Sequence, residues 1–274
     1  MASQARTSPL LVRGADVPEG DLVSIAPSGQ AWRYIRFRAT RLRTDGIIRG
    51  ETADNEMVLV VISGSVHVAS PEGSWKNVGQ RADPFSGPPS AVYLPSSTSY
   101  EIVAASHAEI AICKAPGPKP YPARRIELDT DAGYVRGEGH AQRRIYNILM
   151  DEDGANSLFL TEVITFPGNW SSYPPHKHDT DNPPVESQLE ELYYYRAQPQ
   201  QGFAFQRIYT ESGDLDEMIT AHNTDVVLVP RGYHVCAAAA QYSIYYLNVL
   251  AGPKHVYHMT FDPAHAWIKE GWTW

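Results

Sequence analysis

The sequence has little cysteine and no long apolar run, and each shortage excludes a class of protein. Its two cysteines, Cys113 and Cys236, form no CxxC pair, which argues against a disulfide framework or a thiolate zinc site. No stretch approaches the roughly 20 apolar residues that cross a bilayer, and the segment from Met1 to Leu11 lacks the apolar core of a signal peptide. We therefore expect a cytoplasmic protein with no membrane partner.

Basic clusters are also missing. The net charge is -8, and the basic residues form no run longer than pairs such as Arg124-Arg125 and Arg143-Arg144. Proteins that bind nucleic acids usually carry a basic patch, so we expect no nucleic-acid partner. An anionic substrate would have to be held by a few local cations.

The residues that are abundant favour β-structure. The chain of 274 residues contains 21 prolines, 20 glycines and 16 tyrosines, together with many Val and Ile residues. This composition is typical of short strands joined by tight turns. The length suffices for two domains with cores of their own. We predict an all-β fold.

The same order of elements occurs twice along the chain. A strand opened by a Glu is followed by a turn and a partner strand, then by a Val-rich strand that ends in Pro, and then by a closing strand. A repeat of well over ~100 residues indicates domain duplication, since solenoid periods run ~20–50 residues. We predict two jelly-roll β-barrels with few short helices. The predicted strands lie in 56–68, 91–95 and 100–113 of the first copy and in 191–196, 203–209, 226–230 and 242–250 of the second.

A proline-rich segment, 115–122, separates the two copies. Its four prolines cannot lie in a central strand, so it should form a stiff extended connector. We place the boundary near residue 118, with an N-terminal domain of residues 1–118 and a C-terminal domain of residues 119–274. Helical signals are few: a turn within 213–220, and a short helix after Asp262, which is followed by Pro263.

Four residues of the second half predict a metal site. Residues i and i+2 of an extended backbone face the same way, so His176 and His178 can direct both imidazoles at one ion. Glu191 opens a strand, and His234 follows a Pro-x-Gly turn. A lone His-x-His pair is more often a surface feature, but here three features converge on a divalent-metal site. The neighbouring Glu190 is the competing carboxylate and lies on the opposite face of its strand.

These motifs resemble a known family. His176-x-His178, Glu191 and Pro230-x-Gly-x-His234 are similar to the metal motifs of the cupin superfamily. The longer strings also resemble the 5-deoxy-glucuronate isomerase family of inositol catabolism, which is related to 4-deoxy-L-threo-5-hexosulose-uronate ketol-isomerase. The strings that carry this resemblance are 168–179, 189–196, Arg143-x-x-x-Asn147, 251–253 and 262–267.

The resemblance implies a bicupin with one divalent metal ion, Zn or Mn, in its second barrel. It implies an aldose–ketose isomerase that converts 5-deoxy-D-glucuronate to 5-dehydro-2-deoxy-D-gluconate. The chain departs from the general cupin pattern in two places. The gap between His178 and Glu191 is wide and contains a polar loop, 179–187, which could recognise substrate. The motif that ends in His234 is one residue shorter than usual.

The first barrel should hold no metal. Glu56 matches Glu191 in position, but no His-x-His precedes it, and no His lies in 95–100, where the counterpart of His234 would fall. We expect this barrel to act structurally, by packing against the second barrel or against another subunit of a homo-oligomer.

Isomerisation through an enediolate needs a base near the reacting carbon, whereas the alternative, a hydride shift, needs no base on carbon. We name Glu191, Glu190 and Tyr195 as candidate catalytic residues, with Asp179, Tyr193 and His222 as further candidates for the base. The structural alternative is that the strand tyrosines pack in a core and that His222 lies on a surface loop.

The substrate implied by the resemblance is a small sugar acid, whose carboxylate needs a cation. Arg207, Arg231 and Lys254 lie near the metal motifs, and Asp179 belongs to the polar loop, so these four are the predicted substrate-binding residues. Each could equally be a solvated surface charge. Two other functions stay open: a cupin dioxygenase, and a non-catalytic sugar-binding bicupin.

Overall fold

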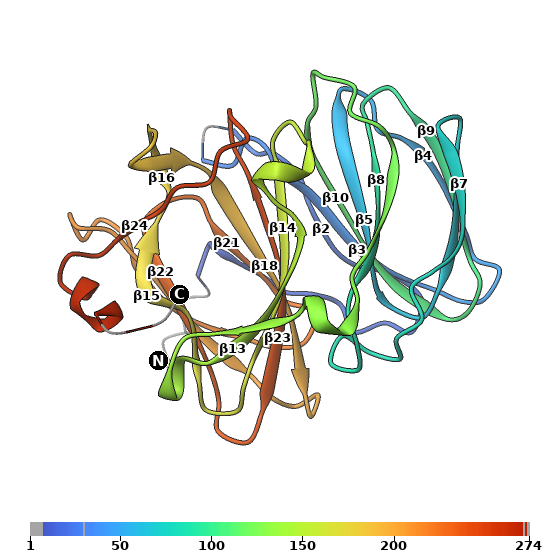
Figure 1. Ribbon diagram of the computed structural model, residues 1–274. Helices are drawn as coiled ribbons and strands as arrows, with labels where there is room; N and C mark the ends of the chain where they lie inside the picture. The colour runs from blue at the N-terminus through green and yellow to red at the C-terminus, as the bar shows by residue number, and fades with distance from the viewer. Residues whose placement is uncertain (1–7, 30, 271, 273–274) are drawn as a thin grey trace, which may run out of the picture.

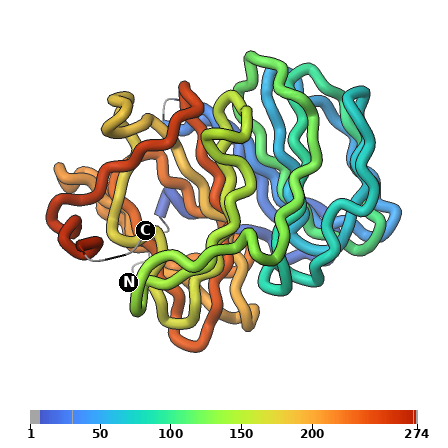
Figure 2. Tube along the Cα trace, viewed as in Figure 1, coloured from blue at the N-terminus to red at the C-terminus, as the bar shows by residue number. Residues whose placement is uncertain are grey.

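The computed structural model describes residues 8–29, 31–270 and 272, so the start of the segment Met1 to Leu11, with Arg6, lies outside the described residues. It contains two β-barrels side by side, the first half of the chain in one and the second half in the other (Figures 1 and 2). This confirms the all-β prediction. Helical structure in the described part consists of four short 3-10 turns: η1 (Thr130–Ala132), η2 (Gly139–Ala141), η3 (Asp151–Asp153) and η4 (Ala266–Lys269).

The first barrel is formed by two antiparallel sheets. A six-stranded sheet has the order β11-β8-β5-β10-β3-β2, and a four-stranded sheet has the order β4-β9-β6-β7. The strands are β2 (Gly20–Ile25), β3 (Arg36–Leu42), β4 (Ile47–Glu51), β5 (Asn55–Ser63), β6 (Val66–Ser70), β7 (Gly73–Val78), β8 (Ser90–Leu94), β9 (Ser99–Ala104), β10 (Ala108–Pro116) and β11 (Arg124–Glu127).

The single strand predicted over 100–113 is wrong. The chain turns after Ala104, where the backbone N–H of Ala105 donates to the carbonyl of Ser65 at 2.9 Å, and β9 and β10 lie in different sheets. Buried apolar residues occur on both sides of this turn, as at Ile102 and Ile110, so the apolar run continues in the sequence where the strand ends.

The second barrel repeats this plan. Its seven-stranded sheet has the order β1-β21-β18-β23-β14-β13-β12, its five-stranded sheet the order β20-β19-β22-β15-β24, and β16 and β17 form a separate hairpin. The strands predicted in this half are confirmed as β18, β19, β21 and β23. The bounds are β1 (Leu11–Val12), β12 (Tyr134–Arg136), β13 (Arg143–Leu149), β14 (Leu158–Thr165), β15 (Trp170–Lys177), β16 (Asp179–Asn182), β17 (Glu186–Gln188), β18 (Glu190–Gln198), β19 (Ala204–Tyr209), β20 (Asp216–Ala221), β21 (Val226–Val229), β22 (Tyr233–Ala238), β23 (Ser243–Ala251) and β24 (Thr260–Phe261).

The two halves exchange edge strands. β1, from the start of the chain, pairs with β21 of the second barrel, and β11, which follows the proline-rich connector, pairs with β8 of the first barrel. β10 ends at Pro116, next to the predicted boundary. The division at residue 118 stays a prediction, because the large sheet of each barrel contains a strand from the other side of it.

The large sheets of the two barrels pack against each other through apolar side chains. On β18, Leu192 and Tyr194 face this core between the barrels, whereas Tyr193 and Tyr195 face the interior of the second barrel. Strands covered on both faces are apolar at consecutive positions, which explains the continuous Val and Ile run of β5. The second barrel therefore has an inner face on which β18 can present a functional side chain.

A buried ion pair also joins the barrels. The Arg81 guanidinium lies 2.5 Å from a Glu162 carboxylate oxygen, and both side chains are almost completely buried. The Tyr245 hydroxyl donates to the same carboxylate at 2.7 Å. The apolar interface between the barrels therefore contains a buried ion pair whose carboxylate is also hydrogen-bonded.

The predicted helical signals correspond to short structures. Asp262 accepts the backbone N–H of Ala264 at 2.9 Å and so caps a turn that leads into η4. The segment predicted to hold a turn, 213–220, begins with a bend and then continues as β20. Within the residues that the structure describes, no helix has the length and apolar character needed to cross a membrane.

Candidate metal centre

Three histidines and one glutamate meet inside the second barrel. His176 on β15 and His234 on β22 are direct cross-strand partners, and His178 follows at the end of β15. Glu191 projects from β18 of the facing sheet. Two histidines two residues apart on an extended strand share a face, so the local backbone directs both towards Glu191.

The four side chains are close together and shielded from solvent. The imidazole nitrogens of the three histidines lie within 4.8 Å of one another. Oε2 of Glu191 lies 2.8 Å from Nε2 of His178 and 2.8 Å from Nε2 of His234. His234 is completely buried and His178 is 2% exposed. The donor atoms therefore converge on one point that water barely reaches.

Backbone carbonyls fix the tautomer of each imidazole. In all three histidines Nδ1 faces a carbonyl oxygen, which can only accept, so Nδ1 carries the proton and Nε2 keeps a free lone pair. Such outer contacts are typical of histidines that bind metals. The accepting carbonyls belong to Pro174 for His176 (3.3 Å), Leu189 for His178 (3.0 Å) and Gly232 for His234 (3.2 Å).

The arrangement fits a divalent cation. Nε2 of His234 is buried and makes no hydrogen bond of acceptable geometry, although it lies 2.8 Å from Oε2 of Glu191. A lone pair and a carboxylate oxygen at that distance repel each other unless a proton or a cation lies between them. The Asn248 amide donates to the other oxygen, Oε1, and so orients the carboxylate. Three imidazoles and one carboxylate are a common donor set for divalent metals.

The pKa values of His176 and Glu191 both shift downward. Burial and the neighbouring imidazoles lower the pKa of His176 well below its ordinary value. Burial acts to raise the pKa of Glu191, but the imidazoles of His234 and His178 hold it well below its usual range. Neutral imidazole and ionised carboxylate are the forms that bind a metal.

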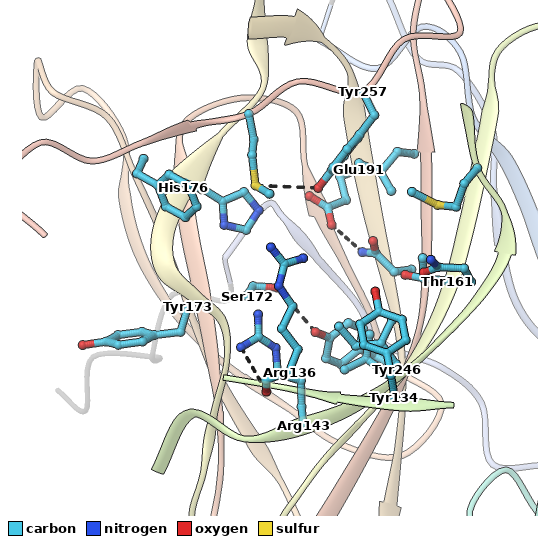
Figure 3. Close-up of a pocket in the computed structure, with 18 residues that line it drawn as sticks. Tyr134, Arg136, Arg143, Thr161, Ser172, Tyr173, His176, Glu191, Tyr246 and Tyr257 are labelled. Atoms are coloured by element: carbon cyan, nitrogen blue, oxygen red, sulfur yellow. Dashed lines mark hydrogen bonds between the residues drawn. The ribbon is translucent and has the colours of Figure 1, made fainter. Parts of the chain in front are cut away.

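Two of the four, His176 and Glu191, line one end of a cavity of about 760 Å³, a volume that includes its open mouth. Glu191 is the one acidic residue among the described residues that line it. Figure 3 shows His176 and Glu191 on one side, with two arginines and several tyrosines around the remaining space. Other polar side chains that line the cavity are Tyr134, Arg136, Arg143, Ser172, Tyr246 and Tyr257.

The structure does not bring Glu190 into the cavity. Its side chain leaves β18 on the opposite face from Glu191, and its carboxylate accepts backbone N–H groups of residues 33–35 at 2.7–2.8 Å. Burial raises the pKa of this carboxyl. A carboxylate held by three backbone donors outside the cavity cannot reach a substrate carbon, so its predicted catalytic role is corrected to a structural one.

The predicted strand tyrosines are core residues. The Tyr195 hydroxyl donates to the side chain of Gln206 at 2.9 Å, and the Tyr193 hydroxyl lies 2.8 Å from Ser172 Oγ. Burial raises the pKa of both tyrosines well above the ordinary value, so neither is a base at neutral pH. Neither lines the cavity. His222, the further candidate, lies on an exposed turn.

The predicted substrate-binding cations also lie elsewhere. Each of the three cations is partly exposed and forms an ion pair with an aspartate, which already balances its charge. We therefore correct the prediction: these residues do not face the cavity. The pairs are Arg207 with Asp216 (2.9 Å), Arg231 with Asp214 (2.6 Å) and Lys254 with Asp181 (2.8 Å).

The predicted polar loop, which contains Asp179, forms the hairpin of β16 and β17. Glu186 organises it by accepting the backbone N–H of Asp179 at 2.8 Å and the ammonium group of Lys177 at 2.9 Å. Asp179 in turn accepts the backbone N–H of Gly232 at 2.7 Å. The hairpin thus supports the turn before His234, and Asp179 does not line the cavity.

The sequence analysis missed the cations that do line the cavity. Arg136 lies on β12 and Arg143 on β13, both well before His176 in the sequence. The one sequence feature that pointed to this wall of the cavity was the string Arg143-x-x-x-Asn147, which is part of the family resemblance. Asn147 also lines the cavity.

The register of the first barrel corrects the predicted match between Glu56 and Glu191. Glu191 pairs with Val229, the residue before Pro230, whereas Met57 pairs with Leu94, the residue before Pro95. Met57 is therefore the counterpart of Glu191, and Glu56 is the counterpart of Glu190. The first barrel has an apolar thioether where the second has its inward carboxylate.

Comparison with known proteins agrees with this architecture. The chain is similar to a 5-deoxy-glucuronate isomerase of Geobacillus thermodenitrificans, with 44% identity over 253 residues that cover 92% of each chain. It is 41% identical over 248 residues to a 5-deoxy-glucuronate isomerase of Bacillus subtilis, covering 90% of this chain and 92% of the relative.

Some solved structures resemble the chain in both sequence and fold, and others in fold alone. The crystal structure of an IolB-like protein from Salmonella typhimurium has a TM-score of 0.91 and 39% identity, and covers 96% of this chain and all of the other. An oxalate decarboxylase of Lactobacillus farciminis has a TM-score of 0.67 at 11% identity over 94% of this chain and 90% of the other, so it shares the cupin fold alone. The sequence model of the KduI/IolB family matches residues 10–268, and we conclude that the chain belongs to this family.

Proposed function

We propose that this chain is a metal-dependent aldose–ketose isomerase that converts 5-deoxy-D-glucuronate to 5-dehydro-2-deoxy-D-gluconate in inositol catabolism. The observation that carries the proposal is the convergence of three imidazoles and one carboxylate at the end of a cavity. Relatives that match nine tenths of the chain are named 5-deoxy-glucuronate isomerases. A cytoplasmic location and a homo-oligomeric state stay predictions.

The reaction moves a proton between neighbouring carbons through an enediolate, whose oxygen carries negative charge. A divalent ion held by His176, His178, His234 and Glu191 would supply an electrophile for the substrate's carbonyl and adjacent hydroxyl. The barrel supplies the low-polarity surroundings in which charge stabilisation is strongest. The remaining tasks, which are to orient the substrate and to manage protons, belong to the other residues of the cavity.

Tyr257 is placed to donate a hydrogen bond to the developing oxyanion. Its side chain reaches the cavity beside Glu191 (Figure 3), where its hydroxyl lies 3.9 Å from the sulfur of Met259. Burial raises its pKa above the ordinary value, so the hydroxyl keeps its proton at neutral pH. A protonated hydroxyl without a strong acceptor can donate to an oxyanion formed next to it.

For the metal we propose Zn or Mn. Imidazole-rich sites with a carboxylate accept both ions, and neither needs a thiolate. The structure of a Bacillus subtilis oxalate decarboxylase, 14% identical with a TM-score of 0.62, is named for its Mn(II) centres. At that identity the likeness shows the fold alone, so the donor set of this chain is the stronger support.

Elemental analysis and an isomerase assay on the same preparation test the proposal. We expect one divalent ion per chain, and conversion of 5-deoxy-glucuronate to a ketose that can be followed by proton NMR. Chelation should abolish conversion and the missing ion should restore it. Oxygen uptake by the metal-loaded protein without ketose formation would instead indicate a dioxygenase.

A further inference from the structure

Two arginines lie directly opposite each other on the wall of the cavity. Arg136 on β12 and Arg143 on β13 are cross-strand partners in an antiparallel pair, and both line the cavity. Like charges directly opposite on one sheet face destabilise the pair. The pairing therefore places two guanidinium groups side by side on the cavity wall.

Arg143 is also buried without an anion. The residue is 6% exposed. Its Nη1 donates to the backbone carbonyls of Ala141 at 3.0 Å and Arg136 at 3.5 Å. Among the residues that the structure describes, no carboxylate oxygen lies within 4.0 Å of its guanidinium. Arg81, which is similarly buried, has Glu162 at 2.5 Å. A buried charge is costly unless it is paired, so Arg143 lacks the partner that Arg81 has.

The backbone beside Arg143 leaves room for this guanidinium. Gly137 follows β12 with a φ of +86°, and a Cβ atom there would lie 2.6 Å from Nη1 of Arg143 and 2.2 Å from the carbonyl oxygen of Ala141. Only glycine adopts this conformation at low cost and avoids both contacts. Glycine at residue 137 therefore leaves space for the Arg143 guanidinium.

Among the described residues that line the cavity, Glu191 is the one carboxylate, and it does not pair with Arg143. The carboxylate of Glu191 is already contacted by His178, His234 and Asn248. Figure 3 shows the side chains of Arg136 and Arg143 reaching into the space between His176 and Tyr246. The cavity therefore has an acidic, metal-binding end and a cationic end with open space between them.

We propose that Arg143, with Arg136 beside it, binds the terminal carboxylate of a sugar acid and so places the carbonyl end of the substrate at the histidine cluster. Arginine can hold a carboxylate through two parallel hydrogen bonds, which fix the orientation as well as the position of the ligand. This inference rests on the proposed function. It adds that the cavity selects acidic sugars over neutral ones and that Arg143 is the specificity-determining residue.

The test compares an acidic and a neutral substrate in matched variants. Arg143→Gln removes the cation, and Arg144→Gln is the control, because Arg144 is the next residue on β13 and is exposed. Each is assayed with 5-deoxy-glucuronate and with 5-deoxy-glucose, in which a hydroxymethyl group replaces the carboxylate. We expect kcat/KM for the acid to fall ~10²–10³-fold in Arg143→Gln, with kcat/KM for the neutral sugar unchanged. The control should leave both within about twofold.

A second readout does not depend on catalysis. Calorimetry should show that the wild-type chain binds the non-reacting acid gluconate more tightly than its neutral counterpart glucitol, and that Arg143→Gln abolishes this preference. Arg143→Lys, which keeps the charge but not the paired donors, should restore part of it. If Arg143→Gln does not fold, the same comparison of gluconate with glucitol is made with Arg136→Gln, which should weaken the preference for gluconate.

The outcomes separate this inference from the proposed function. Equal losses on acidic and neutral ligands, or an unchanged preference for the acid, overturn the carboxylate assignment while the isomerase stands. A wild-type chain that prefers gluconate through Arg143 but never isomerises the acid supports the subsite and overturns the isomerase.

Discussion

The carboxylates of Glu56 and Glu190 make the same contact in opposite directions across the interface between the barrels. Each accepts three consecutive backbone N–H groups from the other half of the chain. Glu56 binds residues 156–158 and Glu190 binds residues 33–35, all at 2.7–2.8 Å. Their strand partners, Ala115 and Ala251, are also equivalent. The duplication therefore kept this glutamate in both barrels as a structural contact between them.

Replacing either glutamate should weaken the interface and leave the metal site intact. Glu190→Gln and Glu56→Gln each turn a carboxylate that accepts three N–H groups into an amide with one acceptor. We expect a loss of about 2–3 kcal/mol in the free energy of unfolding, measured by urea denaturation. Metal content should not change in either variant or in Glu56→Ala. A metal-depleted, stable Glu190→Gln variant would contradict the structural role.

Removing one imidazole should remove most of the metal. His176→Ala and His234→Ala each delete one of four converging donors, whereas the apolar cores of the barrel persist without the ion. Elemental analysis should show little bound metal, and the circular dichroism of each variant should match that of the wild type. His222→Ala, on an exposed turn, is the control and should keep full occupancy. Full occupancy in both site variants would disprove the ligand set.

Chelation should lower the melting temperature without unfolding the chain. An ion that binds only the folded state stabilises it by RT ln(1 + [L]/Kd), which is about 2.7 kcal/mol at a hundredfold excess over Kd. Differential scanning calorimetry with and without added metal measures this shift. The Arg143→Gln variant should show the same shift as the wild type, since Arg143 acts on the substrate. No shift in the wild type would show that the cluster binds no ion.

The buried ion pair between the barrels should be far more sensitive than an exposed one. Glu162→Gln leaves the Arg81 guanidinium buried without its anion, so we expect a loss of about 3–5 kcal/mol in the free energy of unfolding. Glu101→Gln, which breaks the exposed pair with Arg49, should cost below about 1 kcal/mol. Equal effects in the two variants would mean that burial does not decide the strength of these pairs.

Loss of the Tyr257 hydroxyl should slow the reaction without affecting the metal. Tyr257→Phe keeps the ring and removes one hydrogen-bond donor to the oxyanion, which typically lowers kcat ~10²–10³-fold. Tyr209→Phe is the control, because the Tyr209 hydroxyl bonds to Asp262 at 2.5 Å and lies outside the cavity. An unchanged kcat in Tyr257→Phe would remove this residue from the mechanism.

Local patterns in the sequence were enough to predict β18, which carries Glu191, whereas β15 and β22, which position the histidines, were not among the predicted strands. The spacing of His176 and His178 predicts that both side chains point the same way, since residues two apart on a strand share a face. Glu191 was assigned to the inner face because it alternates with Tyr193 and Tyr195, and the structure places all three on that face.

Long-range register could not be derived in the same way. The first half has one glutamate at the start of its strand and the second half has two, so the sequence alone did not show whether Glu56 matches Glu190 or Glu191. Only the pairing with β8 and β21 decides between them. Arg143 was missed for a related reason: its strand reaches the cavity through the order of the sheet, which no short motif encodes.

The exchange of β1 and β11 has a consequence for synthesis on the ribosome. The sheet of the first barrel lacks β11 until Arg124–Glu127 has emerged, and Glu56 lacks its three donors until residue 158 has followed. Burying that carboxylate earlier would leave it without these three backbone donors, at a cost of several kcal/mol. The first half of the nascent chain should therefore stay incompletely closed until more than half of the protein has been made.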